Sequence, residues 1–265
     1  FLALGWSDDY TDRLIERWGP DAHRERNVCD SSDPAADCDG GWAIRYRITR
    51  STPSLVAKAA AHFGVGPNAL TEGVELEQVG PMKGEALKLR VFNGEVMATN
   101  AYLTRATHDL AGGWTFPGGL RSASKSSISL GLLEDLGWYY PVYDNAEALP
   151  WGAGQGLDFA LSPCTAWPDA SGTYVCPRDG GPGTSFDSEG VGSRACNAAR
   201  THVGLCSFVN HPQPLADAYD YFNDPLNAIN WGGASALADY CPLILPEPSG
   251  VLPPSDDAAV RDCTV

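Results

Sequence analysis

Apolar residues recur at helical spacing in three segments of the chain. Residues 11–18 carry leucine, isoleucine and tryptophan on one face and stop at a Gly-Pro pair. Residues 53–63 repeat apolar side chains at every fourth position after a Ser-Thr-Pro start, and residues 127–137 repeat them before a closing glycine. We therefore expect three amphipathic helices in these ranges.

A strand pattern follows the second of these segments. In residues 87–91 apolar side chains alternate with a lysine and an arginine, which predicts a half-buried strand that leads into a turn at Asn93 and Gly94. Beyond Pro163 the periodic pattern gives way to cysteine, glycine and proline. We expect an irregular region there, with a boundary within residues 150–165.

Composition and charge exclude several classes of partner. The chain has 265 residues, of which 43% are hydrophobic and 19% charged, so it can bury a core. Its 18 Lys and Arg residues stand against 33 Asp and Glu residues, and the formal net charge of −15 disfavours nucleic acid and anionic membrane surfaces. No apolar run reaches the roughly 20 residues of a membrane-spanning helix, so no transmembrane segment is expected in this chain.

The cysteines predict a protein of an oxidising compartment. Their number is even and none stands in a C-x-x-C spacing, which favours four disulfides in a secreted or cell-surface protein. The chain begins at Phe1 with neither a Met nor a signal peptide, so we expect a processed or truncated product of a longer protein. There is no Asn-x-Ser/Thr acceptor site, and O-linked sugars on the Pro/Ser-rich tail stay open. The cysteines are Cys29, Cys38, Cys164, Cys176, Cys196, Cys206, Cys241 and Cys263.

The residues alone reveal no active site. No two histidines stand four residues apart, so the H-E-x-x-H motif that places two zinc ligands on one helix face is absent from this sequence. A G-x-S-x-G nucleophile motif is absent too, and paired cysteines leave no thiol nucleophile. The histidines are His23, His62, His108, His202 and His211.

Four stretches carry motifs that occur together in one protein family. They are STPSLVAKAAAHFG with GVELEQVG, then FNGEVMATN, then LLEDLGWYYPVYDNAEALPWGAGQGLDF with a following Pro-Cys, and HPQPLADAYDYFNDP with a following DYCP. In this order they resemble the leishmanolysin family of zinc metallopeptidases (peptidase family M8), which belongs to the metzincins. FNGEVMATN resembles the family's Met-turn, with Met97 as the methionine beneath the zinc.

The resemblance implies an α+β fold in two parts. The first is the C-terminal part of a metzincin-like metallopeptidase fold, and the second is an irregular, disulfide-rich domain. Residues 1–12 would form the end of a degenerate active-site helix, residues 13–162 the metzincin-like C-terminal subdomain with the Met-turn, and residues 163–265 the Cys-rich domain.

The resemblance also implies that the zinc ligands are missing. In the family the third ligating His precedes the Met-turn methionine by eleven residues, which places Ala86 at that position. FLALGWS is similar to the end of the active-site helix, which places Leu2 at the second His. A metzincin variant would use Asp8 as its third ligand, but this cannot complete a site beside an apolar Leu2. We therefore expect no catalytic residue, no metal and no cofactor, with Met97 buried under the end of the Phe1–Gly5 helix and beside Leu2.

The family's disulfide pattern maps onto six of the cysteines. The resemblance implies bonds between Cys164 and Cys241, between Cys176 and Cys206, and between Cys196 and Cys263. It leaves Cys29 and Cys38 as a local pair in a segment that the family does not share.

Together these expectations describe an inactive leishmanolysin-like module of an extracellular or cell-surface glycoprotein assembly. It would serve as a structural, adhesive or protein-binding part, with other proteins of that assembly, or the rest of a longer precursor, as partners. The alternative is a fragment of an active zinc endopeptidase. A third possibility is a lectin-like module built on four tryptophans, which in other proteins are more often core anchors: Trp114, Trp151, Trp167 and Trp231.

Overall fold

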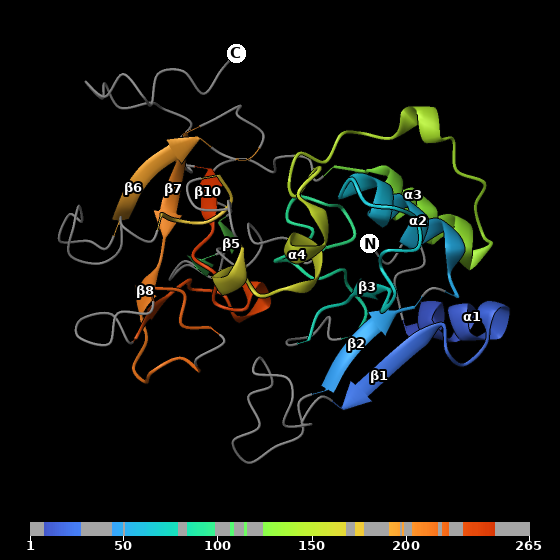
Figure 1. Cartoon of the computed structure of the whole chain (residues 1–265), viewed down its shortest axis with the longest axis horizontal. Helices are drawn as coiled ribbons and strands as arrows, with labels where there is room; N and C mark the ends of the chain where they lie inside the picture. Colours follow the sequence, from blue (N-terminus) through green and yellow to red (C-terminus); the bar gives the residue numbers. More distant parts are fainter. Residues whose placement is uncertain are drawn as a thin grey trace. The chain divides into compact units, whose positions relative to one another are not determined.

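The structure is a computed structural model (Figure 1), and it divides into two compact units. Unit 1 comprises residues 1–100 and 122–161, and unit 2 comprises residues 101–121 and 162–265. The structure describes residues 8–27, 44–49, 51–78, 84–98, 107–108, 114–115, 124–167, 173–177, 191–196, 198, 203–216, 219–222 and 230–246.

The α-helices of the described residues lie in unit 1. They are α1 (Asp8–Trp18), α2 (Pro53–His62), α3 (Ser127–Leu136) and α4 (Gly156–Leu161), and the 3-10 turn η2 (Tyr143–Asn145) lies between α3 and α4. The three predicted helices are confirmed as α1, α2 and α3. None of the helices among the described residues has the length and apolar character needed to cross a membrane.

Helix α3 begins and ends where its sequence signals lie. The Ser126 hydroxyl accepts a hydrogen bond from the N–H of Ile128 at 3.1 Å, and Gly137 takes the left-handed conformation at φ 74° and closes the helix. Inside the helix, Gly131 lies against the backbone of Ser54, where an added Cβ would meet backbone atoms at 3.0 Å. The close packing of α3 on α2 therefore favours a glycine in the middle of this helix.

A short antiparallel sheet of order β1-β2-β3 completes the described elements of unit 1. Its strands are β1 (His23–Asn27), β2 (Ile44–Ile48) and β3 (Val74–Glu75), and Ile48 faces Val74 across β2 and β3. Large buried apolar side chains of this unit come from the four helices and the loops between them, among them Leu14, Leu55, Phe63, Leu76, Phe92, Leu132, Leu136, Trp151 and Phe159.

Unit 2 consists of short strands and 3-10 turns. One sheet has the order β10-β7-β6, and two hairpin-like pairs join β4 with β5 and β8 with β9. Phe208 packs edge to face on Phe222 and on Trp231, with ring centroids 5.5 and 5.3 Å apart. The elements are β4 (Thr107–His108), β5 (Trp114–Thr115), η3 (Cys164–Ala166), β6 (Val191–Cys196), β7 (Val203–Ser207), β8 (Val209–Asn210), β9 (Trp231–Gly232), η4 (Ala236–Ala238) and β10 (Ile244–Pro246).

Candidate functional site

The backbone brings Ala86 and Met97 together within residues 84–98, which we call the turn segment. The N–H of Leu87 donates to the carbonyl oxygen of Met97 at 2.9 Å, and Leu87 pairs with Ala98 in an isolated parallel bridge. Ala86 and Met97 are each 2% exposed. The two described positions that the resemblance assigns to the metal site are therefore buried and next to each other.

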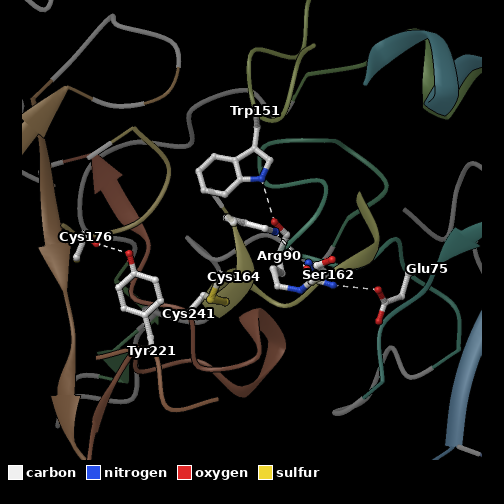
Figure 2. The surroundings of a disulfide bond; sticks show 9 residues. Glu75, Arg90, Trp151, Ser162, Cys164, Cys176, Tyr221 and Cys241 are labelled. Carbon is white, nitrogen blue, oxygen red and sulfur yellow. Dashed lines mark hydrogen bonds and ion pairs between the residues drawn. A yellow bond between two sulfur atoms is a disulfide. The ribbon is translucent and has the colours of Figure 1, made fainter. Parts of the chain in front are cut away.

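Two buried ion pairs fix the first half of the turn segment. Lys88 Nζ lies 2.9 Å from Glu77 Oε1, and Arg90 Nη2 lies 3.0 Å from Glu75 Oε2. Figure 2 shows the guanidinium group of Arg90 pointing to Glu75, which ends β3. All four side chains are buried, and a buried charge is tolerated only when it is paired and hydrogen-bonded.

These pairs correct the prediction for residues 87–91. Instead of a half-buried strand, the structure has turns with a single bridge residue, and both cations of the segment are buried. The prediction was wrong because it treated Lys88 and Arg90 as solvent-facing, although carboxylates farther back in the chain pair with them. The expected turn at Asn93 and Gly94 is present, with Gly94 at φ 90°.

Two side chains from the first part of unit 1 hold the start of the turn segment. The hydroxyl of Tyr10 donates to the carbonyl oxygens of Gly84 and Glu85, at 3.0 and 2.8 Å. Nε2 of His23 lies 2.9 Å from the same Gly84 oxygen. Tyr10 is fully buried, and burial raises the pKa of its hydroxyl, so the group keeps the proton that it donates.

Glu95 ties the second half of the turn segment to the start of α3. Its Oε1 accepts hydrogen bonds from the N–H of Val96 at 3.1 Å, from the N–H of Ser126 at 3.4 Å and from the hydroxyl of Ser129 at 2.5 Å. Its Oε2 has no hydrogen-bond partner among the described residues. Burial raises the pKa of Glu95, and the hydrogen bonds oppose that shift. Glu95 thus caps the N-terminus of α3 from outside the helix.

A second carboxylate caps α2 in the same way. The N-cap residue of α2, Thr52, makes no capping hydrogen bond with its side chain. Instead Asp135, near the end of α3, accepts hydrogen bonds from the N–H of Ser54 at 3.1 Å and of Leu55 at 2.7 Å. Burial raises the pKa of Asp135, while these backbone hydrogen bonds lower it. The capping satisfies amide groups that a helix leaves unpaired at its first turn.

The other end of α2 leads back to the turn segment. His62 Nε2 lies 2.8 Å from the carbonyl oxygen of Trp151, and the N–H of Gly154 donates to the His62 carbonyl oxygen at 2.9 Å. Burial lowers the pKa of His62. The indole N–H of Trp151 donates to the carbonyl oxygen of Arg90 at 3.0 Å, which Figure 2 shows. Hydrogen bonds therefore link the turn segment to α3, α3 to α2, and the C-terminal end of α2, through Trp151, to the turn segment again.

The described residues around Ala86 and Met97 do not fit a zinc site. A catalytic zinc centre takes three protein ligands with nitrogen, sulfur or oxygen donors. In the part of the chain that the structure describes, no group of three His, Cys, Asp or Glu side chains is placed to hold a metal ion. The methyl group of Ala86 cannot donate to a metal, and the carboxylates of Glu75 and Glu77 are engaged by buried cations.

The other residues considered for metal binding lie apart or outside the described ranges. Leu2 lies outside them, and of Asp8 only its place at the start of α1 is described. The histidines with described side chains, His23, His62 and His211, each approach a different backbone carbonyl oxygen. His23 and His62 belong to unit 1 and contact different carbonyl groups, those of Gly84 and Trp151, while His211 belongs to unit 2.

The disulfides of unit 2 include two of the expected pairs. Cys164 is bonded to Cys241 and Cys176 to Cys206, with Cα atoms 6.1 and 5.4 Å apart. Figure 2 shows the first bond, and it shows the Tyr221 hydroxyl, which donates to the Cys176 carbonyl oxygen at 2.6 Å. Cys196 is also disulfide-bonded, and its expected partner Cys263 lies outside the described residues, as do Cys29 and Cys38.

The tryptophans considered for a lectin-like module do not form an exposed set. Trp151 and Trp167 are buried, at 4% and 6% exposure, and Trp231 is half-buried. The side chain of Trp114 is outside the described set. Sequence reasoning missed a different exposed group, the run from Trp138 to Val142, because composition alone does not separate a buried aromatic from an exposed one.

Comparison with known proteins places this geometry in a family context. The family model described as "Leishmanolysin" (Peptidase_M8) matches residues 115–263. The chain is 31% identical over 210 residues to "Leishmanolysin-like peptidase" of Drosophila pseudoobscura pseudoobscura and 32% identical over 211 residues to that of Drosophila melanogaster, in each case over 77% of this chain and 28% of the relative. It is 28% identical over 203 residues to "Leishmanolysin" of Leishmania donovani, over 74% of this chain and 28% of the relative. The chain thus spans little more than a quarter of the length of these relatives.

Proposed function

Because the chain belongs to the leishmanolysin family, peptidase family M8, we propose that it is an inactive member module that acts through contacts. In this proposal it is a structural or protein-binding part of an extracellular or cell-surface glycoprotein assembly. Its partners would be other proteins of that assembly or the rest of a longer precursor. The proposal concerns this module, since the chain covers only 28% of the relatives named above.

The observation that carries the proposal is the buried alanine at position 86. A family peptidase needs a metal donor there, and this chain has a methyl group that is 2% exposed. The residues on either side are held in place, by Tyr10 at Glu85 and by the ion pair of Lys88 with Glu77. These contacts support a turn segment that persists as packing and needs no metal to keep its shape.

The disulfides support the proposed location. The bonds of Cys164 with Cys241 and of Cys176 with Cys206 persist in an oxidising environment, such as the cell exterior, and cytosolic reductants would open them. The chain's charge of −15 argues against anionic membrane lipids and nucleic acid as its partners.

A fragment of a working zinc endopeptidase is the second candidate. The relatives carry the name peptidase and are more than three times as long as the matched region, so ligands could come from another part of a longer protein. This candidate requires that another residue supply the zinc ligand that Ala86 cannot provide.

Zinc content and peptide cleavage, measured on the natural protein at its full length, separate the two candidates. We expect this protein to hold far less than about one zinc per chain after incubation with zinc and gel filtration, because the described residues do not provide three zinc ligands. We also expect no cleavage of casein, with or without a chelator. Zinc at about one per chain, together with cleavage that o-phenanthroline abolishes, would overturn the proposal in favour of the enzyme fragment.

A further inference from the structure

Residues 138–142, which we call the aromatic loop, lie in unit 1 after α3 and expose large apolar side chains. Trp138 is 42% exposed, Tyr139 39%, Tyr140 98% and Val142 60%. Among the described residues the only other large hydrophobic side chain that is exposed is Val209, in unit 2. An exposed cluster of aromatic side chains on a folded domain is a feature of interaction sites.

The N-terminal end of the aromatic loop is fixed, and a cation lies beside it. Gly137 closes α3 in the left-handed conformation, and its N–H donates to the Glu134 carbonyl oxygen at 2.9 Å. The guanidinium group of Arg17, an exposed residue in the last turn of α1, lies against Gly137, where an added Cβ would collide with it. The loop therefore leaves α3, drawn in green to yellow-green in Figure 1, beside a positive charge.

The C-terminal end is fixed as well, and an exposed anion follows it. The hydroxyl of Tyr143 donates to Glu134 Oε2 at 2.5 Å, and the N–H of Asn145 donates to the Val142 carbonyl oxygen at 3.1 Å. Between these two residues stands Asp144, which is exposed. Side chains presented from two fixed ends lose less conformational entropy on binding than those of a free segment.

The other charges near the loop have both signs. The ammonium group of the half-buried Lys58 lies 3.7 Å from the ring centroid of Tyr143. Lys125 and Glu147 are both exposed, and the backbone N–H of Lys125 donates to the Glu147 carboxylate at 2.7 Å. The chain as a whole has a net charge of −15, so a second copy is repelled less at this mixed surface than at a uniformly acidic one.

The order of these charges suits a second copy of the same loop. In an interface with two-fold symmetry the same patch occurs on both partners, and each contact occurs twice. Two aromatic loops that run antiparallel across the axis would bring Arg17 of each copy to Asp144 of the other. The aromatic side chains would then lie between two pairs of opposite charges, which is the usual arrangement of an apolar interface centre with a polar rim.

From this combination we propose that the aromatic loop is a self-association surface, through which two copies of the chain form a two-fold symmetric dimer. Trp138 and Tyr140 form its apolar centre, and Arg17 of each copy pairs with Asp144 of the other. The inference goes beyond the proposed function, because it holds whether or not the module cleaves peptides.

The test is sedimentation velocity of the natural protein at its full length, over a range of concentrations. We expect a reversible dimer with a Kd in the micromolar range, because a single loop buries little area. The double variant W138A/Y140A should weaken the dimer by at least about tenfold, since aromatic anchors carry much of the energy of an interface. V209A removes an exposed apolar side chain of unit 2 and should leave the Kd unchanged.

Charge reversal tests the two-fold pairing. R17E and D144R should each weaken the dimer, because each places like charges together at both edges of the interface. An equimolar mixture of the two variants should associate again as a mixed dimer, since both contacts then join opposite charges. E72K changes the net charge by the same amount as D144R, at an exposed residue in the turn before β3, and should not weaken the dimer. Thermal unfolding of each variant shows that the fold is intact, which the exposure of the substituted side chains makes the expected result.

Several results would overturn the proposal. A protein that stays monomeric up to about 100 μM would remove it. A dimer that W138A/Y140A leaves unchanged would place the interface elsewhere, and failure of R17E and D144R to associate with each other would exclude the two-fold pairing. A change in tryptophan fluorescence on addition of chitohexaose that W138A removes would assign the loop to glycans. None of these results alters the zinc and casein measurements, which test the proposed function separately.

Discussion

Units 1 and 2 differ in what links residues that are far apart in the sequence. The described part of unit 1 has no cysteine, and its long-range links include buried ion pairs and the carboxylates that cap α2 and α3. Unit 2 has no α-helix among its described residues, and disulfides link segments 77 and 30 residues apart. The first turn of a helix offers unpaired amides that a distant carboxylate can satisfy. The two units should therefore respond to different treatments.

Opening the longer disulfide should give the largest effect. The double variant C164A/C241A should lose about 4.5 kcal/mol of stability in the chain-entropy model, for a separation of 77 residues. The bond between Cys176 and Cys206 closes a loop of 30 residues, so C176A/C206A should lose about 3.6 kcal/mol in the same model. Urea unfolding measures the total loss of stability in each variant, and hydrogen exchange shows which segments lose protection. Loss of protection in α2 and α3 equal to that in β7 would contradict the separation of the units.

Breaking a buried ion pair should be nearly as costly, and confined to unit 1. Lys88→Met leaves the buried carboxylate of Glu77 without its cation and should cost about 3–5 kcal/mol in urea unfolding. Glu16→Gln breaks an exposed pair with Arg13, whose side chains are 70% and 33% exposed, and should cost less than about 1 kcal/mol. Equal costs for the two variants would show that burial does not set the strength of these pairs.

Removing the cap that the turn segment supplies to α3 should have an intermediate effect. Glu95→Ala deletes the acceptor of the N–H of the N-cap residue Ser126 and of the Ser129 hydroxyl in the first turn of α3, and it should cost about 1–2 kcal/mol. Glu95→Gln keeps one acceptor oxygen and should recover part of this loss, as measured by thermal unfolding. A loss in Glu95→Gln that equals the loss in Glu95→Ala would show that the negative charge, and not the acceptor, supports α3.

The pH dependence of the free energy of unfolding offers a second test of the role of Glu95. Its pKa is raised by burial, so the folded state binds this proton more tightly than the unfolded state does. Glu95 therefore contributes stability below the unfolded pKa near 4.5, and that contribution is lost as pH rises through the folded pKa. The pKa of His62 is lowered in the folded state, so protonation of His62 reduces the stability of the fold as the pH drops below its unfolded pKa near 6.5. The informative comparison is thus between wild type and Glu95→Gln, because the part of the pH dependence of stability that comes from Glu95 should be absent from the variant.

The smallest expected effect is that of the conservative exchange Met97→Leu. If the turn segment is kept only by packing, Met97→Leu should cost less than about 1.5 kcal/mol, because volume is conserved. Met97→Ala leaves a cavity and should cost about 2–5 kcal/mol. Urea unfolding measures both. A cost of Met97→Leu equal to that of Met97→Ala would show that the thioether itself is needed.

The sequence predicted those parts of the fold that depend on neighbours along the chain. Helix α3 was predictable because apolar spacing, Ser126 and Gly137 all act within one or two turns. The burial of Lys88 and Arg90 was not, because their partners stand 11 and 15 residues earlier. A signal was nevertheless present, since two glutamates spaced by one residue in GVELEQ match the spacing of the two cations in LKLR.

The site was predictable only in part for a similar reason. The resemblance brought Ala86 and Met97 together through a known motif, and the structure has them side by side. The carboxylate caps could not be inferred, because Asp135 reaches amides about 80 residues away and Glu95 reaches one 31 residues away. Exposure of Trp138 beside burial of Trp151 likewise depends on tertiary packing that the local pattern does not encode.

The capping of α3 by Glu95 has a consequence for which substitutions this sequence can tolerate. Glu95 serves the first turn of α3, and Arg90 both pairs with Glu75 and accepts the indole N–H of Trp151 through its carbonyl oxygen. Exchanges at these positions would damage the helix pair whether or not a metal is bound, while position 86 contributes only a methyl group. The turn can thus remain recognisable whatever residue stands at position 86, because folding, independently of chemistry, selects for most of its residues.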